Sequence, residues 1–102
     1  MRSTEDGHVY ELKNLESDEH QTLSFIRKEP VEEESSELKT VHDGTTNEEV
    51  LEMLIDRLQY LQVAMPCREN AIVITKLEES LMWLLNRTAN RKVRGVEGTR
   101  NK

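Results

Sequence analysis

The chain of 102 residues contains a single cysteine, Cys67. One cysteine excludes an internal disulfide and any metal site built from several thiolates within one chain, and it suits a reducing compartment. Aromatic side chains are also few, namely Tyr10, Phe25, Tyr60 and Trp83. This supply is thin for the self-sufficient core of a monomer, so we expect the chain to form one domain that oligomerises.

Long apolar segments are missing as well. No apolar run approaches the ~20 residues that span a bilayer. The first residues, MRSTEDGHVYELK, lack the apolar stretch of a secretory signal. We therefore expect a soluble, cytoplasmic protein.

The sequence shows no set of residues typical of an enzyme. Its three histidines, His8, His20 and His42, all precede the helical part of the chain that holds Cys67, so no nucleophile and base stand near each other in sequence. Closely spaced His and Cys pairs for zinc are absent, and so is the glycine-rich phosphate loop of the Walker type. We predict neither catalytic residues nor a metal or cofactor.

Charge is distributed unevenly along the chain, whose formal net charge is −6. Residues 87–102 hold six Lys or Arg and one Glu, whereas the preceding 86 residues hold 8 basic and 19 acidic residues. The acidic bulk should repel long nucleic acids. The basic segment is either a solvated, frayed tail or part of a site for a small anion.

Strand patterns occupy the first part of the chain. Alternating or β-branched runs at 8–12, 22–26 and 37–41 predict three short strands in an antiparallel meander. Between the last two runs, EPVEEESSE at 29–37 combines proline with five glutamates and predicts an exposed acidic connection. We assign residues 1–44 to this β-rich segment and expect it to pack on the remainder.

Two helices are predicted beyond it. Thr46 and Glu49 form a capping-box pattern, and a helix to about Ala64 then follows from the apolar positions Val50, Leu54, Leu58 and Leu61. The pair Met65-Pro66 interrupts the pattern. The second helix follows at once, with an apolar stripe made by Ile74, Leu77, Leu81 and Leu84, continued by Thr88.

The short connection makes the two helices an antiparallel αα-hairpin over 45–102, ending in the basic tail. The predicted fold class is α+β, with a small antiparallel β-meander followed by a long helical hairpin, as one domain overall. Each helix has an apolar face broader than one partner covers, so we expect oligomerisation through the helices.

Both ends of the second helix carry groups suited to anions. Arg87 and Arg91 lie one turn apart and can fork onto phosphate oxygens, although they equally fit compensation of the helix dipole. Arg68 and Asn70 lie in the first turn, where free amides favour anions. At ~1.5 Å per residue the two ends are about 30 Å apart, so a compact ligand meets both only in an antiparallel dimer.

Three blocks of sequence carry a family resemblance. DGTTNEEVLEMLIDRLQYLQ, PCRENAIVITKLEESLMW and NRTANRKVRGVEGT, in this order, resemble the phage Thoeris anti-defence family, whose members are sponges for cyclic ADP-ribose signals. The pieces HVYEL and QTLSFIRKEPV are similar to the small β-segment of that family, so the resemblance covers nearly the whole chain. The anti-CBASS sponge family shares the helical hairpin.

The resemblance implies a protein without catalytic activity, located in the cytoplasm of an infected bacterium. It would bind the glycocyclic ADP-ribose made by a Thoeris TIR enzyme and withhold it from the effector. It would also form homodimers that assemble into hexamers, as trimers of dimers, with separate pockets for cyclic di- and trinucleotides.

The same resemblance implies a set of ligand-binding residues. Tyr60 would stack on adenine, Asn70 would read polar edges of base or ribose, and the pyrophosphate would be neutralised by Arg87 and Arg91. The segment RGVEGT would close over the ligand through Arg94, Gly95 and Thr99. The cyclic-oligonucleotide pocket would involve Arg68.

The residues alone leave other interpretations open. Tyr60 fits a helix-packing aromatic, Gly95 fits the residue that ends a helix, and Arg68 fits a surface ion pair with Glu69 or Asp56. At the level of function, the rival is a helical-hairpin module that inhibits a host protein directly by docking its basic tail on an acidic surface. A nucleic-acid-binding protein is a third class, disfavoured by the acidic bulk.

Overall fold

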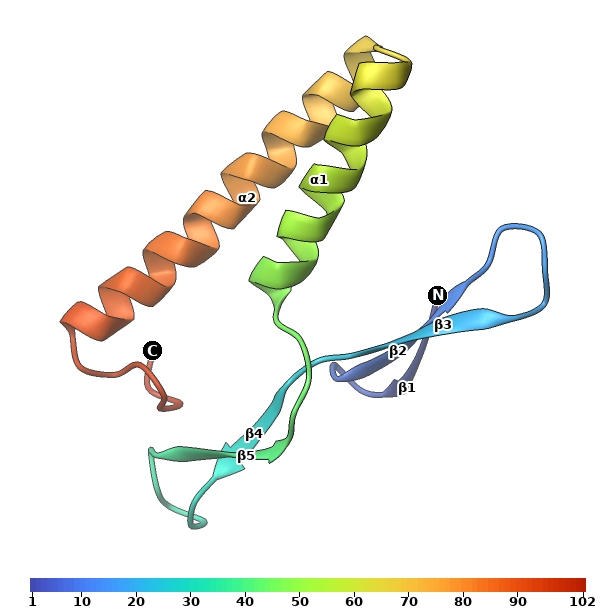
Figure 1. Ribbon diagram of the computed structural model, residues 1–102. Helices are drawn as coiled ribbons and strands as arrows, with labels where there is room; N and C mark the ends of the chain where they lie inside the picture. The colour runs from blue at the N-terminus through green and yellow to red at the C-terminus, as the bar shows by residue number, and fades with distance from the viewer. The chain divides into compact units, whose positions relative to one another are not determined.

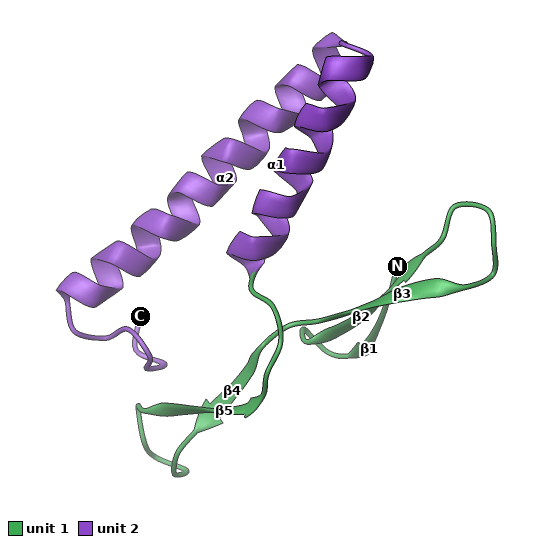
Figure 2. Cartoon of the chain, in the orientation of Figure 1, with its two compact units in different colours: residues 1–46 green, residues 47–102 purple.

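The computed structural model describes all 102 residues, which divide into two compact units, residues 1–46 and residues 47–102 (Figures 1 and 2). Unit 1 contains all of the strands and unit 2 contains both helices. The predicted α+β class is confirmed, because an antiparallel β-meander precedes two helices. The packing of the β-rich segment on the hairpin stays a prediction.

Unit 1 contains two small antiparallel sheets. The first is a meander of β1 (Arg2–Glu5), β2 (Val9–Lys13) and β3 (His20–Ser24), and the second pairs β4 (Arg27–Pro30) with β5 (Leu38–His42). The strands predicted at 8–12, 22–26 and 37–41 correspond to β2, β3 and β5. The predicted count of three strands was wrong, because unit 1 has five. The predicted single meander was wrong as well, since β5 pairs with β4 in a separate sheet.

The two unpredicted strands lack the signal that sequence patterns rely on. Strand β1 reads RSTE and is exposed along its whole length, and β4 reads RKEP. Neither alternates between apolar and polar residues, so only backbone pairing identifies them. One ion pair accompanies the pairing of β1 with β2, between Arg2 and Glu11 at 3.6 Å. Arg27 of β4 lies 3.2 Å from Glu29 of the same strand and 4.0 Å from Glu5 of β1.

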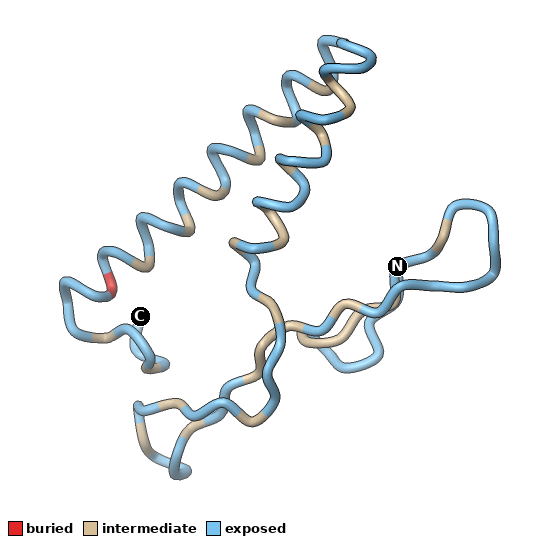
Figure 3. Tube along the Cα trace, viewed as in Figure 1, coloured by how far each residue is buried: buried red, intermediate tan, exposed pale blue.

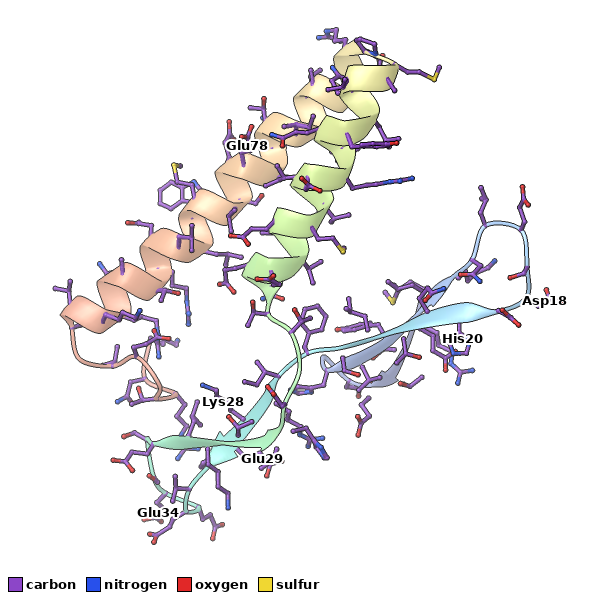
Figure 4. The ribbon with its side chains drawn as sticks, viewed as in Figure 1. Asp18, His20, Lys28, Glu29, Glu34 and Glu78 are labelled. Atoms are coloured by element: carbon purple, nitrogen blue, oxygen red, sulfur yellow. The ribbon has the colours of Figure 1, made fainter.

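The acidic connection predicted at 29–37 is confirmed except at its first two residues, Glu29 and Pro30, which belong to β4. Residues 31–37 form the turn between β4 and β5, closed by a hydrogen bond in which the Val31 amide donates to the carbonyl of Glu37 at 2.9 Å. Glu34 lies on this turn and Glu29 lies on β4 (Figure 4). Both side chains are exposed, which suits the density of negative charge here.

Within unit 1 the chain passes close to itself at Gly44. The Thr45 amide donates to the carbonyl of Ser24, and the Ile26 amide donates to the carbonyl of Thr45, both at 2.9 Å. A Cβ on Gly44 would lie 2.6 Å from the carbonyl carbon of Phe25. No side chain fits in that space, so glycine is required at this crossing.

Unit 2 is the predicted helical hairpin. Helix α1 (Asn47–Ala64) begins directly after Thr46 and ends before Met65-Pro66, as predicted. Helix α2 (Arg68–Val93) is capped by Cys67, whose Sγ accepts a hydrogen bond from the Asn70 amide at 3.4 Å. Neither helix combines the length and apolar character that a membrane span requires.

The predicted apolar stripe of α2 is half-buried along its length. In α1 the prediction was wrong at Leu54, which is 37 % exposed, whereas its neighbours Leu51 and Ile55 are half-buried. Neither helix buries an apolar side chain completely. The half-buried positions of α2 follow a spacing of three and four residues, at Ile74, Leu77, Leu81, Leu84 and Thr88. Several large apolar side chains remain exposed on the hairpin, including Met53, Val63, Met82 and Trp83. The chain contains no buried hydrophobic residue at all.

The two helices differ in length, because α2 has 26 residues and α1 has 18. The eight additional residues extend α2 by ~12 Å at 1.5 Å per residue. In the antiparallel hairpin, α1 begins near the part of α2 that precedes this extension, and the chain beyond α2 turns back beside it (Figure 1). The last turns of α2 therefore pack against residues 95–102, which we call the tail.

Candidate ligand-binding site

The end of α2 has a well-defined local geometry. Gly95 has a positive φ of 73°, the left-handed conformation that glycine adopts without steric cost. Its amide donates to the carbonyl of Lys92 at 3.1 Å, and the Val96 amide donates to the carbonyl of Arg91 at 3.0 Å. This pair of bonds is a Schellman motif, so the interpretation of Gly95 as a helix-ending residue is confirmed. Its part in closing over a ligand stays a prediction.

The tail is held by Arg91, which is the one buried residue of the chain and is only 5 % exposed (Figure 3). Its Nη2 donates to the carbonyls of Val96 at 2.9 Å and Thr99 at 2.7 Å. Its Nη1 donates to the carbonyl of Asn101, and its Nε lies 3.3 Å from Oε2 of Glu97. One guanidinium thus binds four acceptors on the tail.

These contacts separate two arginines that the sequence presents as a pair. The acceptors of Arg91 belong to the tail and not to the last carbonyls of its own helix, so it does more than offset the helix dipole. The side chain of Arg87 has no hydrogen-bond or ion-pair partner in the structure. Arg87 therefore presents an unpaired positive charge, while direct contact of either arginine with a ligand stays a prediction.

A pocket of about 310 Å³ lies at this end of α2. Its lining residues are Trp83, Asn86, Arg87, Asn90, Arg91, Arg94 and Lys102. Four of them are basic and none is acidic, although the chain as a whole is acidic. The volume is at the lower end of the ~300–1,000 Å³ that small-molecule pockets occupy. Positive charge beside neutral amides and an indole suits a small anion with an aromatic ring.

Further hydrogen bonds fix the wall of this pocket. The Arg94 side chain donates from Nε to Oδ1 of Asn90 at 2.8 Å and from Nη1 to the carbonyl of Lys102 at 2.7 Å. Thr99 Oγ1 donates to the carbonyl of Val96 and accepts from the Asn101 amide. The predicted closing residues Arg94 and Thr99 thus organise the tail, and their contacts with a ligand stay predictions.

Tyr60 and Asn70 lie at the other end of the hairpin. Tyr60 is in the last turns of α1 and is 70 % exposed, and Asn70 is in the first turn of α2. Gln62 fixes this turn, since its Nε2 donates to the carbonyl of Cys67 at 2.9 Å and its Oε1 accepts from the Cys67 amide at 3.1 Å. Along α2, Asn70 and Arg87 are about 25 Å apart, so one chain does not bring them together.

Arg68 belongs to a separate pocket of about 370 Å³, lined also by Ala71, Ile72, Thr75 and Lys76. It forms no ion pair with Glu69 or Asp56 in the structure. Two basic side chains beside the start of α2 are compatible with a phosphate site. That Arg68 binds a cyclic oligonucleotide stays a prediction.

Sequence reasoning missed four residues of the pocket at the end of α2, namely Trp83, Asn86, Asn90 and Lys102. Trp83, Arg87, Asn90 and Arg94 follow a spacing of four, three and four residues, which places them on one helical face. From the positions of Arg87 and Arg94, this helical spacing was enough to identify Trp83 and Asn90 in the sequence. Lys102 reaches the pocket only because the tail folds back, which no helical period indicates.

The remainder of the structure contains no group of three or more His, Cys, Asp or Glu side chains that could hold a metal ion. Cys67 is exposed and serves as the cap of α2. The candidate site therefore consists of cationic, amide and aromatic groups.

Comparison with known proteins identifies similar sequences. A family model described as "Acb2/Tad1, hairpin domain" matches residues 25–89. Thoeris anti-defense 1 of Bacillus phage SBSphiJ7 is 59 % identical over 61 residues, which are 59 % of this chain and 43 % of that protein. The matched region thus spans less than half the length of that relative. Tyr60, Arg68, Asn70 and Arg87 lie within the range matched by the family model, whereas Arg91 and the tail lie beyond it.

Proposed function

Because the chain belongs to the Acb2/Tad1 hairpin family, we propose that it is a phage anti-defence protein that sequesters a cyclic nucleotide signal of its bacterial host. The relative's name, Thoeris anti-defense 1, supports this role. The signal would be a glycocyclic ADP-ribose made by a TIR enzyme, bound in the cytoplasm of the infected cell. The protein would hold the signal tightly and leave it chemically unchanged, because withholding the signal needs tight binding and no turnover.

The observation that carries the proposal is the basic pocket at the end of α2. Arg87 lines it without any partner in the chain, so its guanidinium is available to fork onto pyrophosphate oxygens. Trp83 lines the same pocket and is 66 % exposed, which leaves a ring face free to stack on adenine. Asn86 and Asn90 add amides that can donate to ribose or base oxygens and accept from their donors.

A second copy of the chain would complete the site. The pocket of one chain is small, and Tyr60 and Asn70 lie about 25 Å from Arg87 within that chain. In an antiparallel dimer, the turn end of one hairpin would deliver Tyr60 and Asn70 to the basic end of the other. The exposed apolar side chains of the hairpin support such a dimer, which we propose assembles further into hexamers.

Arg68 would serve a different ligand. It lines a separate pocket together with Lys76, beside the amides at the start of α2. We assign this pocket to cyclic di- or trinucleotides, whose phosphates would lie against the two basic side chains. Arg68→Ala should therefore weaken cyclic oligonucleotide binding and leave ADP-ribose binding intact.

The test is to recover the ligand. The purified protein is incubated with a lysate that contains cyclic ADP-ribose isomers made by a TIR enzyme, washed and denatured by heat, and the released small molecules are identified by mass spectrometry. We expect an intact cyclic ADP-ribose from the unmodified protein and little from Arg87→Ala. The control is Lys92→Ala, which removes an exposed positive charge from the same helix outside the pocket.

Each alternative gives a different result. Recovery of only linear ADP-ribose would indicate an enzyme that opens the ring. Recovery of no small molecule, with a host protein retained on the immobilised chain, would favour the direct-inhibition module. Equal recovery from Arg87→Ala and Lys92→Ala would show that the pocket at the end of α2 is not the binding site.

A further inference from the structure

Arg91 has an environment unlike that of any other charged side chain in the protein. It is 5 % exposed, whereas every other arginine and lysine is half-buried or exposed. A buried guanidinium is stable only when its donors are satisfied, and those of Arg91 bind Glu97 and the carbonyls of Val96, Thr99 and Asn101. These acceptors all belong to the tail.

The position of Arg91 on α2 explains why it faces the tail. It follows Leu84 and Thr88 at intervals of four and three residues, so it continues the stripe that faces α1 along the rest of the hairpin. Helix α1 is eight residues shorter, and the tail takes its place beside the final turns. Earlier residues of the stripe pack apolar side chains toward α1, whereas Arg91 places its guanidinium against carbonyl oxygens of the tail.

We propose that Arg91 is a positioning residue, which holds residues 96–101 folded against α2 before any ligand binds. The folded tail carries Lys102 to the wall of the pocket, so Arg91 acts on a ligand through the tail. The part of this inference that concerns the ligand rests on the proposed function, and the part that concerns the tail does not.

The first measurement is made on the free protein. Hydrogen exchange of the Thr99 and Asn101 amides, which donate to Val96 and to Thr99 Oγ1, reports opening of the tail. We expect Arg91→Lys to speed this exchange by about tenfold or more, because an ammonium keeps the charge but lacks the fork that reaches four acceptors. The double variant Arg91→Gln/Glu97→Gln keeps the net charge unchanged and should have a similar effect.

Arg87→Gln is the matched control, since it removes a positive charge one turn away and should leave tail exchange as it is. Exchange of the amides of residues 74–85 monitors the helix itself. Unchanged tail exchange in both Arg91 variants would overturn the inference. So would faster exchange of the helix amides to the same extent, since Arg91 would then support the hairpin in general.

The second measurement uses a purified cyclic ADP-ribose isomer made by a TIR enzyme. We expect Arg91→Lys to raise its dissociation rate by roughly tenfold with little change in the association rate, because a loosened tail no longer retains the ligand. An unchanged dissociation rate would refute the ligand part. If the unmodified protein does not bind the probe, the proposed function fails, while tail exchange still decides whether Arg91 holds the tail.

Discussion

Trp83 provides the sharpest test of the proposed pocket. Its side chain is 66 % exposed and lies four residues before Arg87 on the same helical face. An aromatic side chain that buries ~200 Å² in full would lose on the order of 70 Å² when a purine covers its free face. At ~25 cal/mol per Å² this burial contributes about 2 kcal/mol, within the ~1–3 kcal/mol measured for base–aromatic stacking.

Replacement of Trp83 by Ala should therefore weaken binding of a cyclic ADP-ribose isomer by about 5- to 150-fold, since 1.4 kcal/mol corresponds to a factor of ten in Kd. Trp83→Phe, which keeps a smaller ring, should lose only part of this. Isothermal titration calorimetry measures both. Trp83 is also the single tryptophan of the chain, so stacking should quench its fluorescence as the ligand is added.

Met82→Ala is the control, because Met82 is 56 % exposed but lines the groove between the helices and not the basic pocket. Light scattering gives the mass of each variant, which separates lost stacking from lost association. An affinity of Trp83→Ala within about twofold of the unmodified protein, at equal mass, would refute the stacking argument.

Three further substitutions test the framework of the site. Gly44→Ala should destabilise unit 1 by about 1–3 kcal/mol or more, measured by urea unfolding, because its Cβ would lie 2.6 Å from a backbone carbon. Gly95→Ala should cost roughly 1–2 kcal/mol in the same assay through its positive φ and should loosen the tail. Gln62→Ala should speed hydrogen exchange of the Cys67 amide, which donates to Gln62, and should weaken ligand binding if Asn70 takes part.

Controls for these variants come from the chain itself. Gly7→Ala introduces a Cβ with no atom within 4 Å, so it should cost only the roughly 1–2 kcal/mol of its positive φ and should leave the bond from the Thr45 amide to Ser24 intact. Equally fast hydrogen exchange of the Thr45 amide in Gly7→Ala and Gly44→Ala would argue against a steric requirement at the crossing. Gln59→Ala, on the same helix as Gln62, should leave the Cys67 amide unaffected, and a matching effect of the two would remove Gln62 from its assigned role.

The helices were predictable because their patterns repeat over many residues. Thr46 and Glu49 marked the start of α1, and Met65-Pro66 marked the break between α1 and α2. Strands β1 and β4 were not predictable, since they consist mainly of polar residues and carry no apolar period of two. The link between pattern and structure fails where pairing depends on backbone groups, which all residues share.

The candidate site was likewise predictable in one part and not in another. The basic end of α2 was visible in the sequence as a concentration of positive charge, and the helical spacing of Trp83 and Asn90 could have added them. The different environments of Arg87 and Arg91 could not be predicted, because they depend on a tail whose acceptors are main-chain carbonyls. Charge patterns locate a basic region but do not show which side chain is already occupied.

The nature of those acceptors has a consequence for design. Three of the four groups that Arg91 binds are carbonyl oxygens, at Val96, Thr99 and Asn101, so the contact depends mainly on the path of the backbone, which includes the positive φ of Gly95. Side chains of the tail can change while the anchor persists. Under the proposed function, a library that varies the tail but keeps Gly95, on an unchanged hairpin, would be a direct route to binders of other nucleotides.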